Sequence, residues 1–569
     1  MRAPRALTAA ALAALLALAP APAWAGRPQT GAVGINLADY LNEGATEIAF
    51  VDVFKQSSPW RFGPKWVDPK APVPAEPGAS VVGPDGWVRS LRYDQQAYTR
   101  MFVGAGQYPG GLYKIFYDGD GEIVFYNANR VAGKRPGEID LDVTPTGGPT
   151  AGIVLVIQKT NPANPIRNIR VILPGYENIY MTNPWYPPFL NTLKPFDTIR
   201  FMGWQTTNFD TQREWSERRP PDYATQASAA TYASGPDVKG VSYETIVALA
   251  NELTENPWVS VPTYASDDYV RQMAKLFHQT LNPSLHPMVE YSNEIWNAGF
   301  ATSFCHLREQ AIALRLTWSP GAPCTRDDKG ELVLPADAWT ADGQWYFYAL
   351  RASQIFDIWN AEYGADKDKI VHVVAEWTSN PREIETVLSY GQSINRLADK
   401  ADVIATGAYV DPFSPWSPAI RSGRTTWEQV STMSPADLLR TMNESIEADI
   451  APRFRAAQSQ ARRWGLGLVV YEGGDGNAAS GVRGHYRDAI MRLFNATARD
   501  PGMAEVYTHL LDAWQASGGT LFNQFYDVGG YGLFGQWGAL EYQDQNPATS
   551  PKYRALTDWI RTRGQASGQ

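Results

Sequence analysis

Two short stretches of the sequence end an apolar run on a glutamate. The first is VEYSNEIWN, residues 289–297, which contains Glu294; the second is GLGLVVYEGG, residues 465–474, which contains Glu472. Retaining hydrolysis of a glycosidic bond requires two carboxyl groups roughly 5 to 5.5 Å apart, because one protonates the leaving oxygen and the other attacks the anomeric carbon. The two glutamates can perform this chemistry only if the fold brings them together.

The neighbours of the two glutamates suit these different roles. The acid must hold its proton near neutral pH, and apolar neighbours of Glu294 such as Tyr291 and Trp296 favour the protonated form. The nucleophile must stay ionised, and Arg200 is a candidate cation to stabilise Glu472. The alternative is a pair of solvated surface charges, because charged side chains at strand ends are mostly exposed.

Short apolar runs alternate with helical patterns from about residue 188 onward. Together with a run near the N-terminus they give eight predicted strands: 33–37, 197–204, 258–263, 286–294, 369–377, 402–410, 465–474 and 518–526. Such alternation indicates βα units, and eight of them predict an α/β fold of the (β/α)8 TIM barrel type, with the active site where the strands end. A doubly wound open sheet is the competing fold. It should carry a glycine-rich turn after its first strand, and GINLADYLNEG is not one.

Two helix starts are marked in the sequence between these strands. Ser266 precedes two aspartates and an amphipathic run, and Ser434 precedes Pro435, a residue favoured in the first turn of a helix. The helical stretch opened by Ser434 is expected to stop at Gly465.

The chain between the first and second barrel strands has the period of two that is typical of β-strands. In LYKIFYDGDGEIVFYNANR, two aromatic and β-branched runs flank a Gly- and Asp-rich turn, which predicts a hairpin. A tight turn is a better interpretation of this segment than a calcium loop, because the downstream ligands are missing. We therefore expect a signal peptide at residues 1–25 and the start of the barrel at 26–75. An inserted β-sandwich-like domain is expected at 76–180, and the rest of the barrel at 181–569.

The N-terminus has the features of an export signal. Two arginines precede an apolar run, and Ala23-Trp24-Ala25 forms a small-x-small cleavage site. No later stretch reaches the roughly 18 to 20 apolar residues of a membrane-spanning helix. We expect an exported (secreted or periplasmic) protein with no membrane association in its mature form, and a monomer.

Composition favours a neutral ligand. The formal net charge of −9 argues against nucleic acid as a partner, because nucleic acid needs a basic footprint. The chain has 20 Trp, 28 Tyr and 21 Phe, and tryptophan and tyrosine rings suit both the C–H faces and the hydroxyls of sugars. A carbohydrate substrate is therefore the expected partner, although part of the aromatic content must form the core.

The two cysteines, Cys305 and Cys324, are expected to form one disulfide in an exported chain. Free thiols or a metal site are the alternatives. None of the six histidines lies in a metal-ligand spacing, so no metal and no cofactor are predicted.

Ser292-Asn293-Glu294 on the fourth predicted strand and Glu472 on the seventh resemble the motifs of the clan A (β/α)8 retaining glycoside hydrolases. The resemblance covers residues 188–560 and the first strand. It implies that Glu294 is the acid/base, that Glu472 is the nucleophile and that Asn293 binds the sugar 2-hydroxyl.

By the same resemblance, Arg200 on strand two and Tyr409 on strand six support the nucleophile, and Phe525 or Tyr526 on strand eight lies beneath the sugar. The cellulase-like branch of the clan carries a histidine on strand three and another two residues before the strand-six tyrosine. This chain has Pro262-Thr263-Tyr264 and Gly407-Ala408-Tyr409 at these places. The departure leaves the family within the clan unassigned.

Several tryptophans end or follow a predicted strand. They are candidate platforms for sugar rings or parts of a loop core, and they include Trp204, Trp296, Trp377 and Trp537. The function expected from the whole pattern is secreted glycoside hydrolysis of a polysaccharide or oligosaccharide by a retaining double displacement. The alternatives are a non-catalytic carbohydrate-binding protein on the same barrel, and an inverting enzyme or transglycosylase.

Overall fold

The computed structural model describes residues 31–64, 81–103, 106–127, 129–148, 151–228, 239–375, 380–415 and 417–566. Within these ranges, eight parallel strands close into a barrel. In the order of the barrel they are β1 (Ala32–Asn36), β12 (Thr198–Arg200), β13 (Asn256–Val261), β14 (Met288–Tyr291), β17 (Val371–Ala375), β18 (Val403–Val410), β19 (Gly467–Asp475) and β20 (Leu521–Gln524). The predicted (β/α)8 barrel is confirmed.

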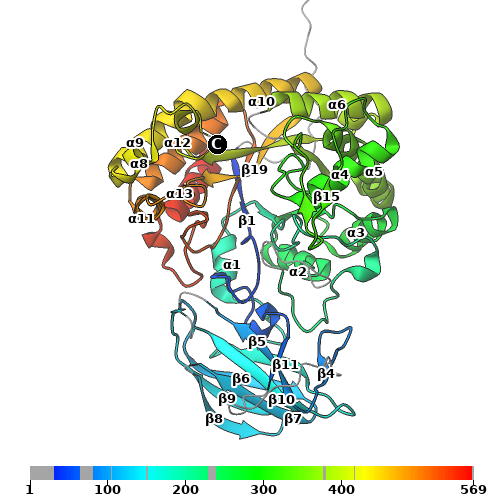
Figure 1. The fold of residues 1–569 in the computed structure, drawn as a ribbon, viewed down its shortest axis with the longest axis vertical. Helices are drawn as coiled ribbons and strands as arrows, with labels where there is room; N and C mark the ends of the chain where they lie inside the picture. Colours follow the sequence, from blue (N-terminus) through cyan, green and yellow to red (C-terminus); the bar gives the residue numbers. More distant parts are fainter. Residues whose placement is uncertain are drawn as a thin grey trace, which may run out of the picture.

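Helices follow the strands and surround the barrel (Figure 1). Their bounds are α1 (Pro187–Leu193), α2 (Tyr243–Leu253), α3 (Asp267–Thr280), α4 (Ala301–Leu314), α5 (Gly343–Tyr363), α6 (Pro381–Asn395), α7 (Pro418–Arg421), α8 (Trp427–Ser431), α9 (Pro435–Ser445), α10 (Ala451–Trp464), α11 (Arg487–Arg499), α12 (Met503–Ala516) and α13 (Pro551–Ala566). All residues of β14 and β17 are buried, because the helices cover the outside of the barrel and side chains fill its interior.

The predicted helix signals are confirmed. The Ser266 side chain accepts a hydrogen bond from the backbone of Tyr269 at the start of α3, and Ser434 forms a capping box with Asp437 at the start of α9. A π-helical turn, Ile446–Ile450, joins α9 to α10. Helix α10 ends at Gly465, whose φ of 73° lies in the left-handed region that favours glycine.

Two four-stranded antiparallel sheets lie between β1 and β12 in the described part of the chain, and form a separate lobe below the barrel in Figure 1. The first contains β2 (Arg61–Pro64), β5 (Gln95–Met101), β10 (Ile153–Thr160) and β7 (Gly121–Tyr126); the second contains β11 (Arg167–Ile172), β6 (Gly111–Asp118), β9 (Glu138–Val143) and β8 (Asn129–Arg135). A short pair, β3 (Val81–Val82) and β4 (Val88–Ser90), accompanies them. Strand β2 precedes residue 76, the expected start of the insertion; the domain boundaries themselves stay a prediction.

The predicted hairpin is wrong. Strands β6 and β7 belong to different sheets, so the chain crosses from one sheet to the other at this turn. Each strand buries one face in the insert, through Ile115 on β6 and Ile123 on β7. The backbone of Asp120 forms hydrogen bonds with the backbone of Asn161 and Asn164, in the turn after β10. These bonds take the place of direct pairing between β6 and β7.

Cys305 and Cys324 form the predicted disulfide, with their Cα atoms 5.7 Å apart. It ties α4 to the segment that contains the short strands β15 (Thr325–Arg326) and β16 (Leu332–Val333). The predicted signal peptide lies outside the described residues. Within the described residues, no helix combines the length and the apolar character that crossing a membrane requires.

Removing the disulfide should reduce stability. The bond closes a loop with a sequence separation of 19, and the chain-entropy account assigns about 3 kcal/mol to a loop of this size. We expect the Cys305→Ser/Cys324→Ser variant to lose about this much free energy of unfolding in urea. Wild-type protein in reductant should show the same loss, and an unchanged unfolding midpoint in both cases would contradict the prediction.

Candidate active site

Arg200, the last residue of β12, is the centre of a buried polar cluster inside the barrel. Its side chain is fully buried, and Nη2 donates to Glu290 at 2.9 Å and to Asn293 at 2.8 Å. Nη1 donates to Asn36 at 3.1 Å and lies 3.4 Å from Glu472. The guanidinium therefore joins side chains from three other strands or their ends, and its planar set of donors suits this role better than a lysine would.

A β-bulge in the middle of β19 brings both Tyr471 and Glu472 into this cluster. Val470 pairs with Thr406 and Glu472 with the next residue, Gly407, so Tyr471 is an extra residue in the ladder. Neighbouring residues of a regular strand point to opposite faces, but a bulge redirects the side chains. The Tyr471 ring lies 5.3 Å from the Arg200 guanidinium. The carboxylate of Glu472 lies 3.4 Å from Nη1 of the same guanidinium.

The chain turns sharply after β14 and places Glu294 against Tyr471. Ser292 and Glu294 have φ values of 60° and 40°, in the left-handed region that non-glycine residues seldom adopt. Such conformations cluster at functional sites. The Tyr471 hydroxyl donates to Glu294 Oε1 at 3.0 Å, and Asn297 Nδ2 donates to Oε2 at 2.9 Å. Glu294 is half-buried, so it is the member of the cluster that reaches the surface of the barrel end.

Asn293 lies between the cluster and a pocket. Its oxygen accepts from Arg200, and its amide donates to Asn208 Oδ1 at 2.9 Å. The pocket beside Asn208 is formed by the loops after β1 and β12, and is lined by Asp39, Met202, Gly203, Thr206, Thr207, Asn208 and Phe209. The Asn208 side chain thereby supports Asn293.

The two candidate catalytic carboxyl groups influence one another electrostatically. Burial, followed by the negative charge of Glu294, raises the pKa of Glu472 well above its ordinary value, while Arg200 and a hydrogen bond from Tyr409 act to lower it. Like charges at close range disfavour double ionisation. The nearby Glu294 carboxylate therefore disfavours the ionised form of Glu472, whereas Arg200 and Tyr409 favour it.

Tyr409 and Tyr471 remain hydrogen-bond donors over the ordinary pH range. Burial and the charges of Glu294 and Glu472 raise the pKa of both hydroxyls well above 10. Each tyrosine thus offers a neutral donor to a carboxylate, which stabilises the ionised form of that carboxylate.

Aromatic side chains after β20 lie beside Tyr409. The Trp537 ring is half-buried and lies 5.4 Å from Tyr409 and 5.6 Å from Phe525. Burial, followed by the charges of Asp39, Tyr40 and Glu472, raises the pKa of the neighbouring Tyr526 well above its ordinary value. Tyr409, Phe525 and Trp537 therefore form one group of aromatic rings.

The other predicted tryptophans have different surroundings. Trp204 is fully buried, its indole nitrogen donates to Glu47 at 3.0 Å, and its ring stacks on Phe189, so it is part of the core in this structure. Trp296 is 7% exposed and lies 6.2 Å from the Tyr471 ring. Trp377 lies outside the described residues.

Three members of the cluster were not among the predicted site residues: Asn36, Glu290 and Tyr471. Glu290 is fully buried on β14 and accepts from Trp258 Nε1 at 2.9 Å as well as from Arg200. Asn36 ends β1 and donates to the backbone of Tyr471 at 2.9 Å. Asn36 and Glu290 could have been found from the sequence by the same signal, which is a polar residue at an inward position of an apolar strand.

Tyr471→Phe should lower turnover without unfolding the protein. The variant loses the hydroxyl that donates to Glu294 but keeps the ring against Arg200. Because a hydrogen bond to a charged group contributes about 1.5 to 3 kcal/mol, we expect kcat/KM on an aryl glycoside to fall about ten- to a hundredfold. Tyr113→Phe is the matched control, since its buried hydroxyl bonds to Pro109 in the inserted sheets. Equal effects of the two variants would contradict a role of Tyr471 at the site.

Comparisons with known proteins give structural but not sequence matches. No protein-family model matches the sequence, and no curated protein matches it. Among solved structures, a GH51 arabinofuranosidase from Xanthomonas axonopodis pv. citri shares 12% identity over 68% of both chains, with a TM-score of 0.39. A 4-O-α-L-rhamnosyl-β-D-glucuronidase from Fusarium oxysporum 12S shares 12% identity over 68% of this chain and 66% of its own, with a TM-score of 0.36.

A third match extends over nearly the whole chain. The CBM22-1 and GH10 modules of a Clostridium thermocellum endo-1,4-β-D-xylanase share 11% identity over 92% of this chain and 97% of their own, with a TM-score of 0.34. At such identities the similarity concerns the fold alone. The chemistry has to be inferred from the side chains of this chain.

Proposed function

We propose that this protein is a retaining glycoside hydrolase in which Glu294 is the acid/base and Glu472 the nucleophile. The observation that carries the proposal is the single cluster that links the two glutamates: Arg200 contacts Glu472, and Tyr471, which precedes Glu472, donates to Glu294. The cluster lies where the barrel strands end, the position of active sites in this fold.

In the first half of the proposed reaction, a carboxylate oxygen of Glu472 attacks the anomeric carbon. The bond from this carbon to the leaving oxygen breaks, and that oxygen takes the proton of Glu294. Arg200 and Tyr409 support the negative charge on Glu472 before attack. The proposed reaction requires the proton on Glu294 and the negative charge on Glu472 at this step.

In the second half, Glu294 acts as a base. It removes a proton from water while the water oxygen attacks the anomeric carbon, and the glycosyl ester bond breaks to release Glu472 as a carboxylate. Two inversions give net retention. We infer that Asn293 binds the sugar 2-hydroxyl and that Trp537 and Tyr526 contact the ring of the sugar.

The substrate class follows from the surroundings of the cluster. Aromatic rings and neutral amides face the site, together with Asp39 in the adjacent pocket. These groups suit a neutral sugar in a polysaccharide or oligosaccharide. With the leader predicted at residues 1–25, the proposed setting is outside the cytoplasm.

A panel of aryl glycosides and polysaccharides, with proton NMR of the first-formed anomer, tests this function. We expect hydrolysis of at least one substrate with retained configuration. An inverted first product would favour an inverting enzyme. Sugar binding without turnover by the intact protein, unchanged in Glu294→Gln, would favour the non-catalytic alternative.

A further inference from the structure

Residues 315–342, the segment between α4 and α5, form a braced projection. It belongs to the connection that follows β14 and Glu294, so topology places it at the end of the barrel where the strands finish. The Tyr264 hydroxyl, from the connection after β13, donates to the Thr302 backbone at 3.2 Å, and its ring lies 3.9 Å from that of His306. Helix α4 is thereby packed against the neighbouring barrel connection.

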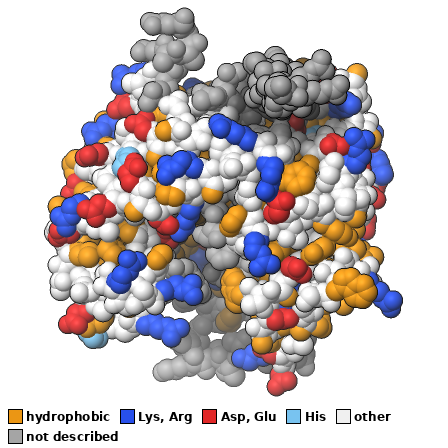
Figure 2. Space-filling model, turned by 90° about the horizontal axis from the view of Figure 1, so that it is seen from above, with side chains coloured by type: hydrophobic (Ala, Val, Ile, Leu, Met, Phe, Trp, Pro, Cys, Tyr) orange, Lys and Arg blue, Asp and Glu red, His pale blue; other side chains and the backbone are white. Residues whose placement is uncertain are grey.

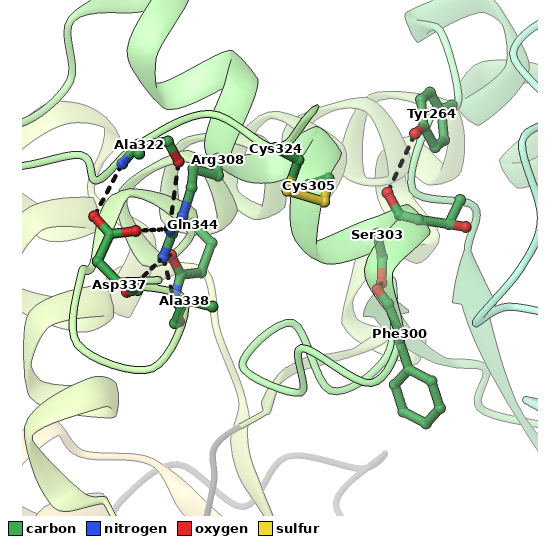
Figure 3. The surroundings of a disulfide bond; sticks show 11 residues. Tyr264, Phe300, Ser303, Cys305, Arg308, Ala322, Cys324, Asp337, Ala338 and Gln344 are labelled. Carbon is green, nitrogen blue, oxygen red and sulfur yellow. Dashed lines mark hydrogen bonds and ion pairs between the residues drawn. A yellow bond between two sulfur atoms is a disulfide. The ribbon is translucent and has the colours of Figure 1, made fainter. Parts of the chain in front are cut away.

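Three features hold this projection in place. The Cys305–Cys324 disulfide joins it to α4, as Figure 3 shows. The fully buried Arg308 guanidinium donates to Asp337 Oδ1 at 2.9 Å and to backbone carbonyls including that of Ala338 at 3.3 Å. A small hydrophobic cluster, separate from the main core, lies beneath it and consists of Ala298, Phe304, Cys305 and Ala338.

This braced segment exposes two tryptophans. The Trp318 side chain is completely exposed, at 104% of the reference area, and Trp339 is 60% exposed. Tryptophan is enriched at interaction surfaces, because its ring offers an apolar face and its N–H a polar edge. The covalent and polar bracing holds the segment while the Trp318 ring lies in solvent.

The charge of residues 315–342 argues against an anionic ligand. Residues 315–342 contain three basic and five acidic side chains. Figure 2 likewise shows basic and acidic groups mixed over the face it presents, with no continuous basic area. An anionic membrane or nucleic acid would need such an area. Exposed indole rings beside neutral and acidic groups suit the C–H faces of neutral sugar rings.

We propose that residues 315–342 form a binding platform for a neutral polysaccharide, in which Trp318 and Trp339 stack on sugar units outside the catalytic cluster. The proposal rests on the proposed function for its choice of ligand. The platform would hold a polymer chain close to the end of the barrel where Glu294 lies, and thereby favour polymeric over short substrates.

Affinity electrophoresis tests the platform. Glu472→Ala protein, chosen so that the polymer is not cut, is run in native gels that contain hydroxyethyl cellulose, arabinoxylan or galactomannan. We expect retardation in at least one gel, and an affinity lowered by about tenfold or more when Trp318→Ala and Trp339→Ala are combined. The single variant Trp318→Phe, in which Trp339 is unchanged, should keep most of the retardation, because phenylalanine still offers a ring.

Tyr93→Ala is the matched control, because Tyr93 is an aromatic side chain with 80% exposure in the inserted sheets. Thermal melts equal to that of the parent establish that each variant is folded. The proposal is overturned if the parent is not retarded in any gel, if the double variant is retarded like the parent, or if Tyr93→Ala has an equal effect. Retardation that depends on the tryptophans, without hydrolysis by the wild type, would contradict the catalytic proposal alone. Hydrolysis by the wild type, with retardation that does not depend on the tryptophans, would contradict the binding platform alone.

Discussion

Glu472→Ala should reduce turnover on the best aryl glycoside about 10⁴- to 10⁶-fold, the range of loss seen when one member of a catalytic triad is removed. The side chain lies in the cluster at the barrel end, 3.4 Å from Arg200, and its removal leaves the anomeric carbon without an attacking group. Added azide should restore part of the activity, because a small anion fits the space left by the carboxylate. Steady-state rates and NMR of the glycosyl azide, expected with inverted configuration, provide the measurement.

The matched control for this prediction is Glu444→Ala, which removes an exposed glutamate from α9. Its turnover should equal that of the wild type. If Glu472→Ala keeps wild-type activity, or if azide rescues Glu294→Ala with inversion and leaves Glu472→Ala inactive, the assignment of the two roles is wrong.

Arg200→Leu should cause the largest loss of stability. The guanidinium is fully buried and is the counter-charge of two buried carboxylates, Glu290 and Glu472. Removing one partner of a buried ion pair costs about 3 to 5 kcal/mol, because the remaining charge is left uncompensated. Urea unfolding should show a loss of about this size near neutral pH.

The pH dependence of this loss has a definite sign. Arg200 acts to lower the pKa of Glu472, so its removal raises the folded-state pKa further above that of the unfolded chain. The folded state then holds a proton that the unfolded state has released, and stability falls as pH rises between the two pKa values. We expect a smaller loss at acidic than at neutral pH.

Arg130→Leu is the control for Arg200→Leu, because Arg130 forms an exposed ion pair with Asp142 in the inserted sheets. Its effect should stay within about 0.5 kcal/mol at either pH. A loss for Arg200→Leu that is equally small, or that grows toward acidic pH, would contradict the role assigned to the buried cation.

The barrel could be predicted because its signals are local and repeated. Each strand is a short apolar run, and the helices carry their own start signals, as at Ser266 and Ser434. The candidate pair Glu294 and Glu472 followed from counting these elements, since equivalent strand ends meet at one rim. Strand bounds were less accurate: the second strand was expected over 197–204, but β12 ends at Arg200, where the chain begins a series of turns.

The finer features of the site depend on contacts that the sequence does not express locally. Strict alternation allows only one of Tyr471 and Glu472 to face the barrel interior, and the bulge that admits both is set by pairing with β18 and β20. The left-handed turn at Ser292 carries no glycine to mark it. Trp204 has the same local pattern as an exposed platform, yet tertiary packing against Phe189 places it in the core.

The most direct test of the central claim is mass spectrometry of a trapped intermediate. The protein is incubated with an activated 2-deoxy-2-fluoro glycoside of the sugar that the substrate panel identifies, and is then digested. The account predicts a mass increase equal to one glycosyl unit on the peptide that contains Glu472, absent from Glu472→Ala. A label on another residue, or turnover of the parent substrate with inversion and no label, would contradict it.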